Sequence, residues 1–109
     1  MKTRLPTDRN DPGNRTYTVN IGAVTLDVTV NLLDGKPMEL FGKATHGHQG
    51  QVDALCTLAS SSLQYGCPAA KVVELLRFRR YDPQGGIGEP SSLADAIGRV
   101  LGKYVEETE

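Results

Sequence analysis

The first half of the chain alternates apolar and polar residues with a period of two. The alternation runs over residues 17–21 and again over residues 24–32, with many β-branched side chains. Such a pattern predicts strands with one buried and one solvent-facing side. Gly22-Ala23 can connect the two strands, and Asp34-Gly35 favours a hairpin because both central positions of that turn need a positive φ. With a third strand over residues 37–44, the pattern predicts a three-stranded antiparallel meander.

From residue 49 onward the apolar residues recur at helical spacing. One apolar stripe predicts a helix over residues 49–65, which ends at Gly66 in a left-handed cap position. Pro68 suits the first turn of a second helix, and that helix is expected to end within residues 77–81.

A third helix is expected after the loop of residues 82–90, which is rich in glycine and proline. It begins at Ser91 or Ser92, and Ser92 and Asp95 stand at capping-box spacing. The predicted fold class is therefore α+β: an N-terminal three-stranded antiparallel meander packed against two to three C-terminal helices.

The chain is expected to consist of a flexible arm at residues 1–14, a single α+β domain at residues 15–105, and a frayed tail at residues 106–109. A sheet of three strands has two edges on which backbone groups lack a neighbouring strand. Pairing between copies is one remedy, so we expect a homo-oligomer, at least a dimer.

Length, net charge and the distribution of apolar residues exclude several classes of protein. A length of 109 residues fits one domain, and a formal net charge of -1 argues against general nucleic-acid binding. No apolar run approaches the roughly 18 residues of a membrane span. The first residues also lack the apolar core of a signal peptide. We therefore expect a cytoplasmic protein in which Cys56 and Cys67 are free thiols rather than a disulfide.

Three segments together resemble the TSCPD domain: residues 34–41 (DGKPMELF), residues 62–68 (SLQYGCP) and residues 91–97 (SSLADAI). The resemblance covers roughly residues 16–104. TSCPD domains are found near the C-terminus of adenosylcobalamin-dependent ribonucleotide reductases and in some free-standing small proteins. The resemblance implies a fold and a setting in nucleotide metabolism. It does not imply reductase activity, because the chain has no room for the catalytic barrel.

The sequence departs from the family pattern where the family often carries cysteines. Those places hold Arg79-Arg80-Tyr81 and Ser91-Ser92 here. A thiol or metal role of the family cysteines is therefore absent. The two cysteines present do not have the spacing of a zinc site, and His46 and His48 complete one only if the fold brings them close.

Arg77, Phe78, Arg79, Arg80 and Tyr81 form the most suggestive stretch for function. Three guanidinium groups beside two aromatic rings combine recognition of anions with stacking surfaces, as a nucleotide requires. A structural alternative is open, because the C-terminal end of a helix favours cations. In that case Phe78 covers the core and the arginines form a solvated edge.

Two helix starts offer further candidate anion sites. Gly47, His48 and Gly50 precede the first helix, and Ser91 and Ser92 precede the third. The alternatives are a plain turn that needs glycines and an ordinary helix cap. The loop of residues 82–88 fits either a mobile flap or a surface loop without a role.

We find no arrangement of catalytic residues, and the acids Glu39, Asp53 and Glu74 lie isolated on predicted solvent faces. The expectation is a non-catalytic oligomer without a cofactor or metal that binds an anionic, nucleotide-like ligand. It could sequester a signalling nucleotide, such as a cyclic nucleotide or an ADP-ribose derivative, or regulate an enzyme of nucleotide metabolism. The alternative is an accessory module that docks on an adenosylcobalamin-dependent ribonucleotide reductase. Membrane binding is not expected.

Overall fold

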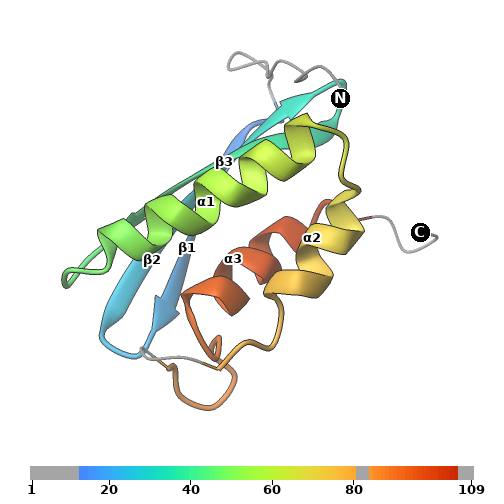
Figure 1. The fold of residues 1–109 in the computed structure, drawn as a ribbon. Helices are drawn as coiled ribbons and strands as arrows, with labels where there is room; N and C mark the ends of the chain where they lie inside the picture. The colour runs from blue at the N-terminus through green and yellow to red at the C-terminus, as the bar shows by residue number, and fades with distance from the viewer. Residues whose placement is uncertain (1–12, 81–83, 106–109) are drawn as a thin grey trace.

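The computed structural model describes residues 13–80 and 84–105. In chain order its elements are β1 (Arg15–Ile21), β2 (Val24–Leu33), β3 (Lys36–Ala44), α1 (Gln49–Gln64), α2 (Ala69–Leu76) and α3 (Leu93–Gly102). The predicted α+β fold is confirmed, because three antiparallel strands are followed by three helices (Figure 1). Residues 1–12 and the predicted tail lie outside the described residues. Asn14, which the sequence assigned to the arm, accepts a hydrogen bond from the Leu32 backbone N–H at 2.7 Å.

The sheet has the strand order β1-β2-β3, and both pairings are antiparallel. The predicted turns are present: Asp34 and Gly35 have φ values of 52° and 78°, and Gly22 has 60°. The β2–β3 register shifts between Asn31 and Leu32. The meander is thus the one expected from the period-two pattern.

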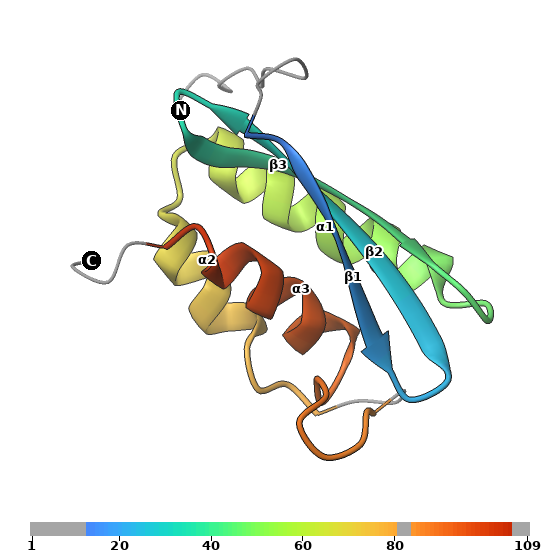
Figure 2. The same cartoon turned by 180° about the vertical axis from the view of Figure 1, so that it is seen from behind.

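α1 packs against β3 and α3 against β1 and β2, all on one face of the sheet, and α2 packs mainly against α3. The opposite face carries none of the described helices (Figures 1 and 2). The covered face presents Leu26, Val28 and Val30, which are fully buried against residues such as Ile97 and Leu101. On the uncovered face, cross-strand polar pairs follow one another. Thr16 and Thr29 hydroxyls lie 2.8 Å apart, and Thr18 donates to Asp27 at 2.7 Å.

Two glycines permit close contacts between elements. A Cβ at Gly42 of β3 would collide with Val52 of α1 and lie 3.2 Å from the Cys56 sulfur. A Cβ at Gly98 of α3 would lie 3.0 Å from the Leu76 Cβ of α2. These positions set how near α1 comes to β3 and how near α2 comes to α3.

The ends of the helices explain where the chain turns. Gly66 has φ 98°, its N–H bonds the Leu63 carbonyl, and the Cys67 N–H bonds the Ser62 carbonyl, which together form a Schellman motif. The second helix ends at Leu76, earlier than the latest end that the sequence allowed. Arg77, the C-cap, is already extended with a ψ of 145°, and Phe78 follows in a left-handed conformation with φ 63°. Among the described residues, no helix has the length and apolar character that a bilayer crossing requires.

Candidate functional site

A buried carboxylate, Asp95, organises the junction between α2 and α3. Its side chain is completely buried. Oδ1 accepts hydrogen bonds from the Phe78 backbone N–H at 2.8 Å and from Arg77 Nε at 3.1 Å. Oδ2 accepts from the Ser91 N–H at 2.9 Å and lies 3.4 Å from Arg99 Nε. We call these residues, with Ser92, the Asp95 cluster.

The cluster keeps Asp95 charged. Burial would raise the pKa of Asp95, but the backbone donors Phe78 and Ser91, together with Arg77 and Arg99, outweigh burial and lower it. Ser92 is the N-cap of α3 and accepts a hydrogen bond from the Asp95 N–H at 3.0 Å, as its capping-box spacing predicted. The return bond differs from the usual box, because the carboxylate bonds Ser91 rather than the cap residue. The anion-compatible start of α3 is therefore occupied by the chain's own carboxylate.

The segment beyond α2, residues 77–80, forms what we call the arginine–aromatic turn. Phe78 is 71% exposed, and the Arg77 guanidinium lies 4.3 Å from the centroid of its ring. The part of the structural alternative in which Phe78 covers the core is wrong, because the ring is largely exposed, whereas its other part, a solvated edge of arginines, is compatible with the structure. Arg79 and Arg80 are also exposed, and Arg79 Nε donates to the Leu75 carbonyl at 2.9 Å. Tyr81, the last candidate of this stretch, lies outside the described residues.

The glycine loop before α1 lies elsewhere. His46 and Gly47 have positive φ values of 58° and 81°, and His48 is the N-cap of α1 without a side-chain cap bond. In both ribbon views α3 stands between this loop and the end of α2 (Figures 1 and 2). Within one chain, Gly47, His48 and Gly50 are thus separate from the arginine–aromatic turn. In the part of the chain that the structure describes, no three His, Cys, Asp or Glu side chains gather as metal ligands would.

The loop after the arginine–aromatic turn is held by several bonds where it is described. Gly85 N–H bonds the Pro90 carbonyl, and Glu89 Oε1 accepts from the N–H groups of Gly22 and Gly86. These two donors lower the pKa of Glu89, Gly22 being the stronger. Arg99 adds bonds to the Gly88 and Glu89 carbonyls. These bonds favour a fixed surface loop over a mobile flap for residues 84–90.

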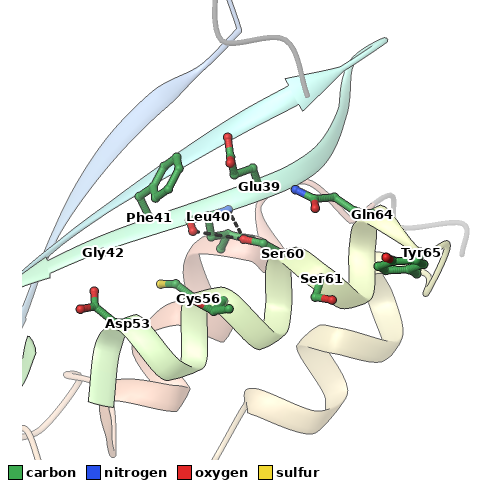
Figure 3. Close-up of a pocket in the computed structure, with 11 residues that line it drawn as sticks. Glu39, Leu40, Phe41, Gly42, Asp53, Cys56, Ser60, Ser61, Gln64 and Tyr65 are labelled. Atoms are coloured by element: carbon green, nitrogen blue, oxygen red, sulfur yellow. Dashed lines mark hydrogen bonds between the residues drawn. The ribbon is translucent and has the colours of Figure 1, made fainter. Parts of the chain in front are cut away.

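A second candidate region is a groove of about 480 Å³ between β3 and α1, which we call the polar groove (Figure 3). Its walls are Glu39 and Phe41 on β3 and, on α1, the row of Asp53, Thr57 and Ser61 at one-turn spacing. Figure 3 shows Ser60 reaching from α1 to the backbone of Leu40 at its base. The sequence prediction missed this groove because it treated Glu39 and Asp53 as isolated acids on solvent faces. Small polar residues repeating every four positions were the signal.

The polar groove has acidic character. Glu39 was predicted on a solvent face but is only 6% exposed, and its Oε1 accepts from Asn31 Nδ2 at 3.0 Å across the strands. None of the described residues lining the groove is a Lys, Arg or His. Burial, and then the nearby Asp53 carboxylate, raise the pKa of Cys56 to about 12, so its thiol stays protonated. The groove therefore offers neither a cation for an anionic ligand nor a reactive thiolate.

The structure thus brings together Arg77, Phe78, Ser91 and Ser92 at one junction, with Arg79 and Arg80 beside it, and leaves the glycine loop apart. The sequence prediction missed the residue that joins them, Asp95. The opposite charges of Asp95 and Arg99, four positions apart on one helix, were the available signal.

The strands, turns and helix ends described above all fall within a single match to a known family. No curated protein and no solved structure matches the chain. The family model of the TSCPD domain matches residues 2–105 and so includes every described strand and helix. Because this match spans nearly all of the 109 residues, the chain belongs to the TSCPD domain family.

Proposed function

We propose that this chain is a non-catalytic, oligomeric protein that binds an anionic, nucleotide-like ligand at the arginine–aromatic turn. The observation that carries the proposal is the exposed ring of Phe78, which has a left-handed backbone and a guanidinium stacked beside it. A bulky residue at positive φ costs on the order of 1–3 kcal/mol and persists only where the surroundings impose it. Such strain at an exposed aromatic residue supports a binding role.

The Asp95 cluster is what imposes this conformation. The carboxylate accepts both the Phe78 N–H and Arg77 Nε, so it fixes the backbone and the guanidinium at once. Among the described residues, the two terminal nitrogens of Arg77 have no hydrogen-bond partner. They remain available as donors next to the ring. A binding surface that is fixed in advance loses less entropy when the ligand arrives.

The chemistry of the turn matches a nucleotide. A ring that is largely exposed can stack on a base, and guanidinium groups bind phosphate oxygens with paired donors. Arg79 and Arg80 add two exposed cations beside the ring. The polar groove lacks such cations, which is why we assign the anion to the turn. Binding of this kind would serve to sequester a signalling nucleotide or to regulate an enzyme of nucleotide metabolism.

Thermal unfolding against a panel of nucleotides tests the proposal. The panel includes deoxynucleotides, cyclic dinucleotides and ADP-ribose derivatives. A ligand present at 100 times its dissociation constant stabilises the native state by about 2.7 kcal/mol. Each kcal/mol shifts the midpoint of a domain of this size by roughly 4–8 °C. We expect one class of nucleotide to shift it, and no shift across the panel would contradict the proposal.

Variants that keep the hydrogen bonds to Asp95 then locate the site. Phe78→Gly suits the positive φ and removes the ring, and it should not lower stability by more than about 1 kcal/mol. The lost stacking should weaken binding by about tenfold to hundredfold. The Arg79→Ala/Arg80→Ala pair should weaken it as well, whereas the control pair Lys36→Ala/Lys43→Ala, which removes two exposed cations from β3, should not. Equal affinity in all three proteins would show that the site lies elsewhere.

A second candidate function is an accessory module that docks on an adenosylcobalamin-dependent ribonucleotide reductase. Exposed apolar side chains favour it, since Leu75 and Phe78 at the end of α2 and Ile87 in the following loop are all more than half exposed. Sedimentation with a purified reductase chain separates the two candidates. Complex formation without any nucleotide-dependent shift would support docking over ligand binding.

A further inference from the structure

The two edges of the sheet differ in how their outward backbone groups are paired. From Leu40 to the end of β3, the outward residues are Leu40, Gly42 and Ala44, and side chains of α1 bond to at least one backbone group of each. Ser60 Oγ accepts from the Leu40 N–H at 2.8 Å and donates to its carbonyl at 3.2 Å. Gln49 accepts from the Ala44 N–H at 2.9 Å and donates to the Gly42 carbonyl at 2.8 Å. We call this the covered edge.

On β1, the register shows which groups face outward. Ile21 pairs with Val24 across the two-residue turn, and the pair that closes such a turn is hydrogen-bonded. Hydrogen-bonded and non-hydrogen-bonded pairs alternate along an antiparallel ladder, so Thr16, Thr18 and Asn20 direct their backbone N–H and C=O groups away from β2. Within the described residues, none of these outward groups has a hydrogen-bond partner. We call this the open edge.

Apart from the exposed Arg15 at its start, the open edge lacks the features by which proteins usually prevent edge pairing. Between Thr16 and Ile21 there is no proline and no charged side chain, and the register with β2 is regular throughout. Except for Asn20, the residues are β-branched or aromatic, types that strands favour. On the helix-covered face, the side chains of Tyr17 and Val19 are only half-buried. A further strand beside β1 would cover them.

We propose that β1 pairs antiparallel with β1 of a second copy of this chain, which joins two sheets into one of six strands. The inference deepens the oligomeric part of the proposed function, on which it rests, and is independent of the ligand. Antiparallel pairing of a strand with itself is self-complementary about a two-fold axis. Thr18 is the middle residue of β1, and an axis there lets the two Thr18 residues exchange both backbone bonds.

Charge favours the same arrangement. With the axis at Thr18, the exposed Arg15 of one copy lies opposite Ile21 of the other, next to the Gly22 turn. The Glu89 carboxylate bonds the Gly22 N–H at 2.9 Å, and its pKa is lowered, so it is ionised at neutral pH. Opposite charges therefore come near each other at both ends of the shared ladder. This complementarity selects a second copy as the occupant of the edge.

Light scattering on the full chain across a dilution series tests the proposal, since one copy has a mass of 11.8 kDa. We expect a mass of two copies, or of a larger even number of copies. Thr18→Pro removes two intermolecular N–H bonds per pair without touching the β1–β2 ladder. It should raise the dissociation constant roughly tenfold to hundredfold. Thr18→Lys keeps the N–H and places two like charges at the axis, with Asp27 nearby in each chain to tolerate the new side chain.

Thr57→Lys, the same change at an exposed position of α1, is the matched control and should keep the parental mass. Hydrogen exchange gives a second measure: the amides of Thr16 and Asn20 should exchange slowly in the concentrated parent and rapidly in both Thr18 variants. A parent that stays monomeric, or a dimer that persists in both Thr18 variants, would overturn the proposal. Ligand variants at the arginine–aromatic turn should keep the parental mass, so a failed nucleotide screen does not alter this result.

Discussion

The sheet has a covered edge and an open edge, which differ in whether their outward backbone groups have hydrogen-bond partners. The β3 edge is paired by side chains of a helix that follows it directly in the chain, and Gly42 lets that helix approach. The β1 edge carries its outward groups without a partner among the described residues. The comparison indicates that a small α+β domain can restrict strand pairing with other chains to one edge of its sheet. The predictions below test how each edge contributes to stability and to association.

The largest expected effect on stability comes from the α2–α3 junction. It also tests whether the covered edge depends on that junction. Asp95→Asn removes the charge that offsets Arg77 and Arg99 at the α2–α3 junction, and breaking a buried ion pair costs about 3 kcal/mol or more. Chemical denaturation should measure this loss, and the exposed Asp34→Asn serves as the control. Hydrogen exchange should speed up in α2 and α3 while β3 and α1 stay protected. Equal loss of protection in α1 would show that the covered edge depends on this junction.

Acid should reproduce part of that effect in the parent. The pKa of Asp95 is lowered in the folded protein, so the unfolded chain takes up the proton first as the pH falls. The stability that this carboxylate adds is complete above the ordinary value of about 3.9 and is lost as the pH falls toward the lowered pKa. Glu89 acts in the same direction. Denaturation between about pH 5 and pH 2 should therefore show a steeper decline for the parent than for Asp95→Asn.

Gly42→Ala should weaken the bonds of the covered edge by pushing α1 away from β3. The added Cβ would collide with the Val52 side chain, which is β-branched and cannot rotate away freely. Overpacking of this kind costs typically about 1–3 kcal/mol. The double variant Gly42→Ala/Val52→Ala should lose less than the sum of the single changes, because the truncated side chain makes room. Strict additivity would mean that the two residues do not define the contact.

Ser60→Ala should weaken the covered edge while leaving the helix in place. It leaves the Leu40 N–H and carbonyl without their side-chain partner, at a cost of about 1–3 kcal/mol. The neighbouring Ser61→Ala, at an exposed position, should stay within about 0.5 kcal/mol of the parent. Unchanged stability would show that water replaces the serine at no cost.

The smallest expected effect on stability comes from the open edge itself. Thr18→Lys alters an exposed side chain, and the folded monomer at high dilution should keep its free energy of unfolding to within about 0.5 kcal/mol. The change should be visible in the mass alone. A large loss of stability in the dilute protein would mean that the Thr18–Asp27 bond holds the hairpin together, and the two edges would then differ less than we infer.

The sequence predicted the strands, their turns and the three helices because each rests on local information. Alternation, the Asp34-Gly35 pair and Gly66 all act within a few residues, and the structure confirms each of them. The prediction of two exposed edges was wrong for β3. No local pattern indicates that Ser60 and Gln49 lie opposite β3 backbone groups, since that depends on how α1 crosses the sheet.

The candidate site was predictable in composition but not in conformation. The arginines and Phe78 stand out in the sequence. The exposure of the ring, however, accompanies a turn of the backbone at Arg77 and Phe78 that is bonded to Asp95, 17 residues away. Glu39 was assigned to solvent for the same reason: its burial beside Asn31 and α1 is a tertiary effect.

The covered edge is made of neighbours in the chain, which has a consequence for how the protein folds. Only residues 45–48 separate β3 from α1, and the bonds between Leu40 and Ser60 close a loop of 20 residues. The hydroxyl contact between Tyr17 and Tyr104 spans 87 residues and needs α3 in place. Shorter loops cost less entropy to close and form earlier. During synthesis, β3 can therefore be shielded as soon as α1 leaves the ribosome, whereas β1, made first, stays exposed to other nascent chains throughout.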